Sequence, residues 1–312
     1  MSAKPFTIAL TGATGFVGRR VLSLLLERGH RVRALARSSR KLPDHEHLTR
    51  ISGTLDDTEP LRALVRDSEA VIHVAAATSG FSYDDLARTN VAGSERLLEA
   101  IASTAPAARL IHVSSLAARE PQLSDYAASK RSAEDRVSAS AAHWLIIRPP
   151  AVYGPEDPAL APLWRMLARG WLPRTGPDNA RFSLLHVDDL GSALVNAAEC
   201  GWPDPVKIDL HDGQHNGYGW ADIAAIATGI HGKRVRMIGL PRALLRAAGA
   251  TNLAIARLRR ARPPVLVPNK VAELVHPDWV CDNTRLPGCP DWQPTRMLKD
   301  SLMTLPGWKE FQ

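Results

Sequence analysis

Thr11-Gly12-Ala13-Thr14-Gly15-Phe16-Val17-Gly18 is the stretch that decides the fold of this 312-residue chain. The apolar residues 6–10 precede it and leucines at helical spacing follow it, so the order is strand, tight turn, helix. Gly12 allows a sharp turn, Gly15 allows the backbone to approach a pyrophosphate, and Gly18 allows the helix to lie close to a sheet. The free amides at the helix start add positive charge. The stretch therefore predicts a dinucleotide-binding site.

The residues after the second predicted strand, 30–36, discriminate between two dinucleotides. A carboxylate about 20 residues beyond the last glycine would bind the free ribose hydroxyl of NAD. Here the chain has Arg37-Ser38-Ser39-Arg40-Lys41, with no acid among them. These side chains would bind a 2'-phosphate, so NADP(H) is favoured over NAD(H) as the cofactor. A solvated basic loop that contacts no cofactor is the alternative interpretation.

A serine pair and a tyrosine–lysine pair indicate the chemistry. Ser114 and Ser115 end an apolar run, and Tyr126 follows Ser115 by eleven residues, with Lys130 one helical turn later. Positions four apart share a helix face. A nearby ammonium lowers the pKa of a phenol from its usual value of about 10, so Tyr126 would become a workable proton shuttle. A serine hydroxyl would stabilise charge on the substrate oxygen. An ordinary helix pair is the alternative, which the upstream glycine turn disfavours.

Together these residues resemble the extended short-chain dehydrogenase/reductases, also called the NAD-dependent epimerase/dehydratase family. Four later motifs stand in the family's order: Val71-Ile72-His73-Val74-Ala75-Ala76, Asn90-Val91-Ala92-Gly93-Ser94, Arg148-Pro149-Pro150-Ala151-Val152-Tyr153-Gly154-Pro155 and Arg181-Phe182-Ser183-Leu184-Leu185-His186-Val187-Asp188-Asp189. The resemblance and the alternation of apolar strands with amphipathic helices predict an α/β fold, a Rossmann-type doubly wound parallel sheet with a smaller C-terminal substrate-binding cap. We expect the NADP-binding domain over residues 1–152, with the chain returning to it at 181–200, and the cap mainly over 153–312.

The resemblance also implies roles for single residues. Ser115, Tyr126 and Lys130 would be catalytic, with Lys130 also touching the nicotinamide ribose, and the family pattern selects Ser115 over the adjacent Ser114. The cofactor would be bound by Gly12, Thr14, Gly15, Phe16, Val17, Gly18, Arg37, Ser38, Leu55, Ala75, Ala76, Asn90, Lys130 and Pro150. One departure concerns the adenine contact, because the family's Gly-Asp pair after the third strand is Gly53-Thr54 here.

The same comparison separates the reactions of the family. Sugar-nucleotide dehydratases carry Thr-Asp-Glu where this chain has Ser115-Leu116-Ala117, so dehydration is rejected. The short link between Ser115 and Tyr126, together with the basic residues after the second strand, favours a reductase that releases NADP. An NAD-dependent sugar-nucleotide epimerase is the alternative within enzymes. A non-catalytic protein that senses a dinucleotide or stabilises a complex is the alternative of another class, although it would not need a proton shuttle.

Composition agrees with an enzyme of the cytoplasm. The hydrophobic content of 45% supports a substantial core. The first strand begins almost at residue 1, which leaves no room for a signal peptide, and no run of 18 apolar residues exists. Cys200, Cys281 and Cys289 are odd in number and lack Cys-x-x-Cys spacing, so we expect free thiols and neither a disulfide nor a metal site.

Charge is concentrated in one segment. Residues 223–272 contain no Asp or Glu and ten of the 39 basic residues, which leaves 29 basic against 32 acidic residues elsewhere. Pro241 starts a predicted helix with arginines between its apolar positions, ending before Pro263 and Pro264. The segment 233–262 would contact an anionic membrane from the inner face, clamp an anionic substrate, or form a solvated cap helix.

The expected partners follow from these patterns. Nucleic acid is not expected, because the basic segment lacks interleaved aromatic residues. A small-molecule substrate is expected, and the part from Pro268 to Val280 is similar to bacterial reductases of ketone-bearing lipids such as 3-oxo-ceramides, which implies a hydrophobic ketone. The family resemblance also implies a homodimer through helices beside the sheet.

Overall fold

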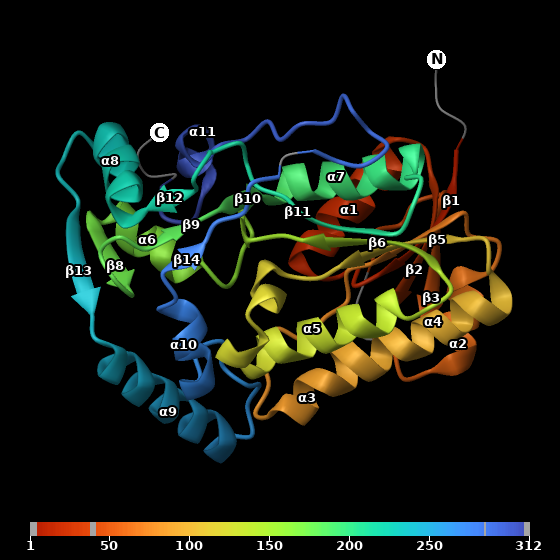
Figure 1. The fold of residues 1–312 in the computed structure, drawn as a ribbon, viewed down its shortest axis with the longest axis horizontal. Coiled ribbons are helices and arrows are strands. Elements are labelled where there is room, and N and C mark those ends of the chain that lie inside the picture. Colours follow the sequence, from red (N-terminus) through yellow and green to blue (C-terminus); the bar gives the residue numbers. More distant parts are fainter. Residues whose placement is uncertain (1–4, 38–41, 284, 309–312) are drawn as a thin grey trace.

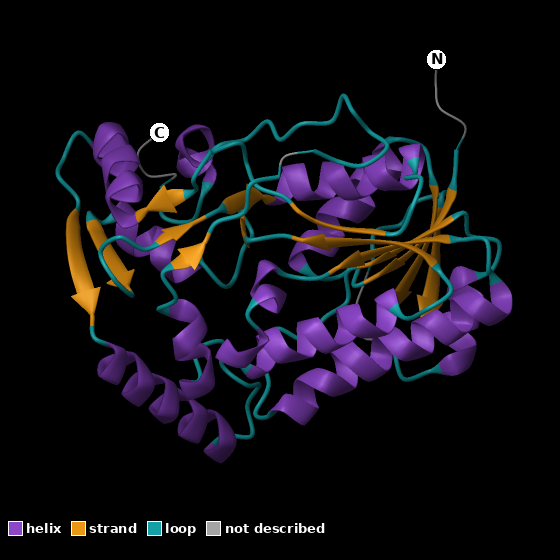
Figure 2. Cartoon of the chain, in the orientation of Figure 1, coloured by secondary structure: helices purple, strands orange, loops and turns teal. Residues whose placement is uncertain are grey.

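A seven-stranded parallel sheet forms the centre of the molecule in the computed structural model, which describes residues 5–37, 42–283 and 285–308 (Figures 1 and 2). Its strands, in the order β11-β6-β5-β4-β1-β2-β3, are β11 (Val206–Asp209), β6 (His143–Arg148), β5 (Arg109–Val113), β4 (Ala70–His73), β1 (Thr7–Thr11), β2 (Arg31–Ala36) and β3 (Leu48–Ser52). All neighbours pair in parallel. The strand order reverses between β1 and β4, the point where such sheets bind ligands at their carboxyl ends.

Helices cover both faces of this sheet. On one face lie α1 (Phe16–Glu27) and α7 (Val187–Cys200), which pack against apolar side chains of β1, β2 and β5. On the other face lie α2 (Thr58–Val65), α4 (Gly93–Thr104) and α5 (Asp125–Ser138). Because both faces are covered, a central strand such as β4 is buried along its whole length. The predicted α/β class and doubly wound sheet are confirmed.

A second apolar cluster belongs to the later part of the chain. It is built around Tyr153, Trp164 and Trp308, each buried. The helices and strands of this part are β7 (Ala151–Tyr153), α6 (Ala161–Ala168), β8 (Trp171–Thr175), β9 (Arg181–Phe182), β10 (Leu184–His186), β12 (Tyr218–Gly219), α8 (Trp220–His231), β13 (Arg236–Leu240), α9 (Arg242–Leu258), α10 (Val271–Leu274), β14 (Asp278–Trp279) and α11 (Leu298–Ser301). The division of the chain at residue 152 stays a prediction.

The basic segment contains the helix that the sequence predicts. Pro241 precedes α9, whose last residue is Leu258, ahead of the two prolines. Only Leu245, Gly249 and Ala256 of this helix are buried. Gly249 lies so close to the following chain that a Cβ there would come within 3.0 Å of the Pro268 nitrogen. A glycine that weakens the helix therefore allows the close approach of the segment leading to α10.

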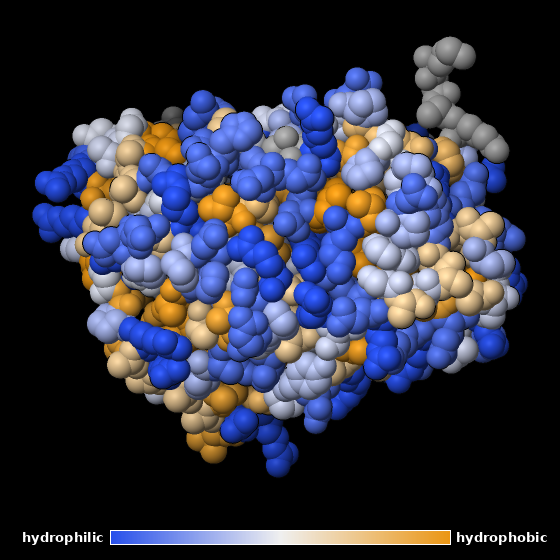
Figure 3. Space-filling view, viewed as in Figure 1, coloured by the Kyte–Doolittle hydropathy of each residue, from blue (hydrophilic) through white to orange (hydrophobic). Residues whose placement is uncertain are grey.

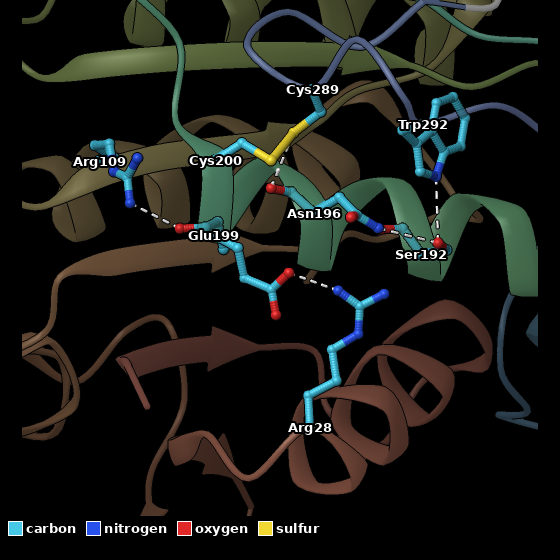
Figure 4. Close-up of a disulfide and its surroundings, with 9 residues drawn as sticks. Arg28, Arg109, Ser192, Asn196, Glu199, Cys200, Cys289 and Trp292 are labelled. Carbon is cyan, nitrogen blue, oxygen red and sulfur yellow. Dashed lines mark hydrogen bonds and ion pairs between the residues drawn. A yellow bond between two sulfur atoms is a disulfide. The ribbon is translucent and has the colours of Figure 1, made fainter. Parts of the chain in front are cut away.

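The expectation of three free cysteines is wrong. Cys200, the last residue of α7, forms a disulfide with Cys289, with 5.8 Å between the two Cα atoms (Figure 4). Cys281 is free and buried. The bond joins residues 89 positions apart, and such a pairing leaves no spacing pattern in the sequence. It fixes the loop before α11 to the helix that covers the sheet, where the Trp292 indole also donates to the Ser192 hydroxyl at 3.2 Å.

Candidate active site

The glycine turn lies at the carboxyl end of β1 and is packed too tightly for side chains. Gly12 has a φ of +74°, and a Cβ there would come within 2.7 Å of the Ala75 nitrogen beyond β4. A Cβ on Gly18 would overlap the Gly12 carbonyl oxygen. Gly15 is exposed and caps α1 without any side-chain hydrogen bond to the first amides. The turn thus leaves a bare backbone at a helix start, which fits a dinucleotide pyrophosphate.

The other residues predicted to bind the cofactor near this turn differ in burial, and some of them lie outside the described residues. Thr14 is half-buried in the turn itself, and Phe16 and Val17 are half-buried in the first turn of α1. Arg37 is exposed directly after β2, whereas Ser38 and the rest of the predicted phosphate-binding residues, 39–41, lie outside the described residues.

The loops after β3 and β4 approach the turn from the other side. Ala75 donates its amide to the Thr11 hydroxyl, at 3.2 Å, and the neighbouring Ala76 is exposed. Leu55 is buried against Gly93. At the departure from the family pattern, the Thr54 hydroxyl donates to Asp57 at 2.8 Å. A threonine hydroxyl bound to an acid thus occupies the place of the missing carboxylate.

Asn90 connects this loop to the helix of the predicted catalytic residues. Its side chain is buried and accepts a hydrogen bond from the Ala77 amide at 2.7 Å. Its amide group donates to the Ala77 carbonyl at 3.0 Å and to the Ser129 hydroxyl at 2.9 Å. Asn90 therefore fixes the loop after β4 against α5. On the far side of the site, Pro150 is buried after β6.

The structure distinguishes the two adjacent serines. The Ser114 hydroxyl is buried and donates to the Glu134 carboxylate at 2.6 Å. Ser115 is half-buried, caps a short 3-10 helix by accepting from the Ala117 amide at 3.2 Å, and lies near enough to the Tyr126 phenol to lower its pKa. Of the two serines, Ser115 is therefore the one near the Tyr126 phenol, and its catalytic role stays a prediction.

The electrostatics of the tyrosine differ from the expectation. Burial raises the pKa of Tyr126 to about 12, the Ser115 hydrogen bond lowers it, and the Glu273 carboxylate raises it. The Lys130 ammonium, which is buried, donates to the Val113 carbonyl at 2.8 Å. The expectation that Lys130 lowers the pKa of Tyr126 below its ordinary value is wrong for this structure, because burial of the phenol outweighs the favourable contacts. Burial lowers the pKa of Lys130 to about 8, so the ammonium form still predominates at pH 7.

A buried carboxylate below the site was missed by the sequence analysis. Glu134 is fully buried and accepts from Arg148 at 2.7 and 2.6 Å, from Ser114, and from Lys207 at 2.9 Å. Burial alone would raise the pKa of Glu134, but these hydrogen bonds and the Arg148 charge hold it below its ordinary value. Glu134 follows Lys130 by four residues, so the face shared by Tyr126 and Lys130 could have indicated it.

Two buried histidines, paired across the neighbouring strands β4 and β5, lie near the carboxyl ends of these strands. His73 is hydrogen-bonded to the Thr11 hydroxyl at 2.7 Å and to the Ser94 hydroxyl at 2.9 Å. Burial, followed by the Lys130 charge, lowers the pKa of His73 to about 3, and the same two causes lower the pKa of His112. Both imidazoles are therefore neutral at pH 7. Within residues 5–37, 42–283 and 285–308, no cluster of side chains could hold a metal ion.

This combination of a bare glycine turn at the switch point of a doubly wound sheet with a serine–tyrosine pair and a buried lysine defines a class of protein. The model of the NAD dependent epimerase/dehydratase family matches residues 8–205, and the chain belongs to this family. It is an NAD(P)-dependent oxidoreductase of the extended short-chain dehydrogenase/reductase type, as the reductase-named relatives below also support.

Individual proteins narrow the comparison further. The chain is 38% identical to a ceramide reductase of Caulobacter vibrioides over 274 residues, which are 87% of this chain and 85% of that protein. It is 31% identical over 220 residues to a 4-hydroxy-2-methyl-3-oxo-4-farnesyl-3,4-dihydroquinoline-1-oxide ketoreductase of Stigmatella aurantiaca, covering 62% of this chain and 64% of the relative. In structure it is similar to a UDP-glucuronic acid 4-epimerase of Bacillus cereus solved with UDP-glucuronic acid and NAD, with a TM-score of 0.67, 19% identity and 98% of each chain covered. At that identity the likeness concerns the fold alone.

Proposed function

We propose that this protein uses NADP(H) to reduce a ketone to a secondary alcohol on a hydrophobic, lipid-like substrate. The observation that carries the proposal is the neighbouring pair of Ser115 and Tyr126 at the carboxyl edge of the sheet, on the same side as the bare glycine turn. The relatives named as reductases of a ceramide and of a farnesylated ketone support a hydrophobic substrate.

Each residue of the site has its own role in the proposed reduction. When bound, the nicotinamide supplies a hydride to the carbonyl carbon. The Ser115 hydroxyl stabilises the charge that develops on the carbonyl oxygen, and Tyr126 transfers its phenolic proton to that oxygen. Because its pKa is about 12, Tyr126 holds this proton throughout the physiological range. The Lys130 ammonium, fixed by the Val113 carbonyl, supplies positive charge one helical turn from Tyr126 as the phenol becomes a phenolate.

The alternative enzyme is an NAD-dependent sugar-nucleotide epimerase, and consumption of cofactor separates the two. A ketone reductase oxidises NADPH stoichiometrically, whereas an epimerase returns its cofactor unchanged. We therefore expect steady NADPH consumption with a short-chain 3-oxo-ceramide and none with UDP-glucuronic acid. Binding of NADPH without turnover of any ketone in a panel would instead favour the non-catalytic, dinucleotide-sensing alternative.

The preference for the phosphorylated cofactor is proposed from Arg37. We expect Arg37→Asp to weaken NADPH binding about tenfold or more and to affect NADH little, because a carboxylate repels the 2'-phosphate and suits a free hydroxyl. Fluorescence titration with both cofactors measures this. Arg31→Asp is the matched control, since Arg31 is an exposed arginine at the opposite end of β2. Equal affinities for the two cofactors in the unmodified protein would contradict the preference.

We also propose that α9 and its flanking residues, within 233–262, contact an anionic membrane. Leu244, Ile255 and Leu258 are 55%, 44% and 86% exposed. With Ala248 and Thr251 they follow a spacing of four, three, four and three residues, which places them on one helix face. Hydrophobic and strongly hydrophilic residues lie side by side along the lower edge of Figure 3, where Figure 1 shows α9. The face thus combines apolar side chains with basic ones.

Charge favours a membrane over a second copy of the chain as the occupant of this face. The arginines beside it are Arg242, Arg246, Arg257, Arg259, Arg260 and Arg262, and none of them has an ion-pair partner among the described residues. Two such faces would repel each other, whereas anionic lipid attracts each basic group by about 1 kcal/mol. In the described ranges no helix is long and apolar enough to cross a bilayer, so the proposed contact is peripheral.

Flotation with vesicles tests the membrane contact. We expect binding to vesicles rich in phosphatidylglycerol, little binding to pure phosphatidylcholine, and a loss of about tenfold or more in Arg259→Glu with Arg260→Glu. The control reverses two exposed arginines elsewhere, Arg31 and Arg66. Indifference to lipid charge would favour a solvated helix. Concentration-dependent self-association that Leu258→Ser abolishes would assign the face to a contact between two copies of the chain instead.

A further inference from the structure

The segment that follows α9 returns to the predicted catalytic helix. It consists of a 3-10 turn, η4 (Pro268–Lys270), and α10, and Figure 1 shows α10 between α9 and the start of α5. Asn269 donates its side-chain amide to Asp125, the first residue of α5. Glu273 accepts a hydrogen bond from Ser124, the N-cap of α5, at 2.6 Å. Residues 144 and 149 positions apart are thus joined at the helix start that carries Tyr126.

This contact places two opposite charges at Tyr126. The Lys270 ammonium lies 4.3 Å from the centroid of the Tyr126 ring. It also pairs with the Glu273 carboxylate at 3.1 Å, and both side chains are only 14% exposed. A cation at this distance from a phenol in a half-buried site favours the phenolate, and an anion opposes it. In agreement, the Glu273 carboxylate raises the pKa of Tyr126.

We propose that Lys270 and Glu273 are positioning residues of the site, which set the pH range over which the Tyr126 phenol gives up its proton. The proposal rests on the proposed function only in its consequence for ketone reduction. It adds a cation from the later part of the chain to the surroundings of the tyrosine, whereas Lys130 donates to the Val113 carbonyl.

Most other charged groups on elements that pack against α5 are paired elsewhere, and Asp84 and Glu99, which have no ion-pair partner among the described residues, are exposed. Arg119 donates to the carbonyls of Asp278 and Val280, Glu120 accepts from Gln122, Arg88 pairs with Asp85, Glu95 pairs with Arg136, and Glu134 is bound by Arg148 and Lys207. His73 and His112, near Lys130, are neutral at pH 7 because burial lowers the pKa of both. Among the described residues, Lys270 and Glu273 are therefore the charged side chains that contact the Tyr126 ring or shift the pKa of its phenol.

Two substitutions of opposite charge test the proposal without any substrate. Lys270→Met leaves the Glu273 anion alone at the phenol, so Tyr126 should ionise at a pH higher by roughly one unit. Glu273→Gln keeps an oxygen that accepts from Ser124 but removes the anion, so ionisation should begin at a lower pH by a similar amount. The double variant should return close to the unmodified protein, and Lys270→Arg should not change the titration.

The measurement is the ultraviolet absorbance of the phenolate after stopped-flow pH jumps on the full chain. Subtracting the trace of Tyr126→Phe in each background isolates this tyrosine from the other three of the chain. The expected order of ionisation, from low to high pH, is Glu273→Gln, unmodified protein, Lys270→Met. Coincident titration curves, or shifts of both variants in the same direction, would overturn the proposal. A merely structural role would not shift the titration of Tyr126 in opposite directions when a cation and an anion are removed.

The pH dependence of kcat/KM for reduction of a short-chain 3-oxo-ceramide provides the second readout. Its decline at high pH should move upward in Lys270→Met and downward in Glu273→Gln. If the titrations separate as expected but no ketone is reduced, only the proposed function fails. If ketone is reduced and the titrations coincide, only the role of Lys270 and Glu273 fails.

Discussion

Tyr126→Phe is expected to lower kcat for ketone reduction by about 10²- to 10⁴-fold, the range that general acid catalysis contributes. The substitution removes one oxygen and with it the only proton that the site is proposed to deliver. It leaves the ring, which lies under Lys270, and the glycine turn unchanged. We therefore expect an unaltered affinity for NADPH, measured by fluorescence, beside a lost rate of NADPH oxidation.

Tyr83→Phe is the matched control for this loss. Tyr83 lies in α3 (Tyr83–Ala87), and its hydroxyl is hydrogen-bonded to Ser132 of α5 at 3.1 Å. Tyr83→Phe therefore also removes one phenolic hydroxyl that contacts α5, but this hydroxyl is bound to Ser132 and not to Ser115. Turnover near the normal rate in Tyr126→Phe would remove the assignment of the proton donor. An equal loss in both variants would show that α5 had been displaced.

Glu134→Ala is expected to reduce the free energy of unfolding by about 3 kcal/mol, the lower end of what removing one partner from a buried ion pair costs. The fully buried carboxylate is the common partner of Arg148 and Lys207, whose side chains are 13% and 27% exposed. Without it, two cations lose their counter-charge near the Lys130 ammonium. Both cations are partly exposed, so water can hydrate them when Glu134 is absent. For this reason we expect a loss in the free energy of unfolding at the lower end of that range.

Urea unfolding at several pH values measures this effect and its sign. The pKa of Glu134 is lowered in the folded state, so its contribution is complete above the unfolded value of about 4.3 and is lost as pH falls through the folded pKa. The difference between the two proteins should be constant near pH 7 and shrink in acid. Glu59→Ala is the control, because Glu59 is 79% exposed and pairs with Arg62, which predicts a change below about 1 kcal/mol. Equal losses in both variants would contradict a special role for the buried carboxylate.

Some features, such as the glycine turn, depend only on residues that are close together in the sequence, and local patterns predicted these features. The glycine turn requires φ above zero at Gly12 and bare backbone at Gly15, and only glycine meets both conditions without strain. The choice of Ser115 over Ser114 came from the family pattern and stays a prediction, and in the structure the Ser114 hydroxyl is bound to Glu134 instead. The α/β class followed from the alternation of elements.

Contacts between distant residues could not be read in the same way. Lys130 and Glu134 are buried in α5, a helix of mostly polar composition, so no apolar stripe marked its inner face. The pKa of Tyr126 depends on burial and on Glu273, and neither is visible from the four-residue spacing to Lys130. The disulfide and the return of α10 to α5 arise from the tertiary path of the chain, which leaves no local signature.

The contact of Lys270 and Glu273 with the start of α5 has an evolutionary consequence. The nucleotide-binding half and the residues that tune its acid are encoded almost 150 codons apart. Recombination can therefore replace the segment of Lys270 and Glu273 while the nucleotide-binding part is inherited intact. A chimera that receives residues 263–281 from a relative with another pH optimum should inherit that optimum as well, which would make this segment the unit by which such reductases diversify.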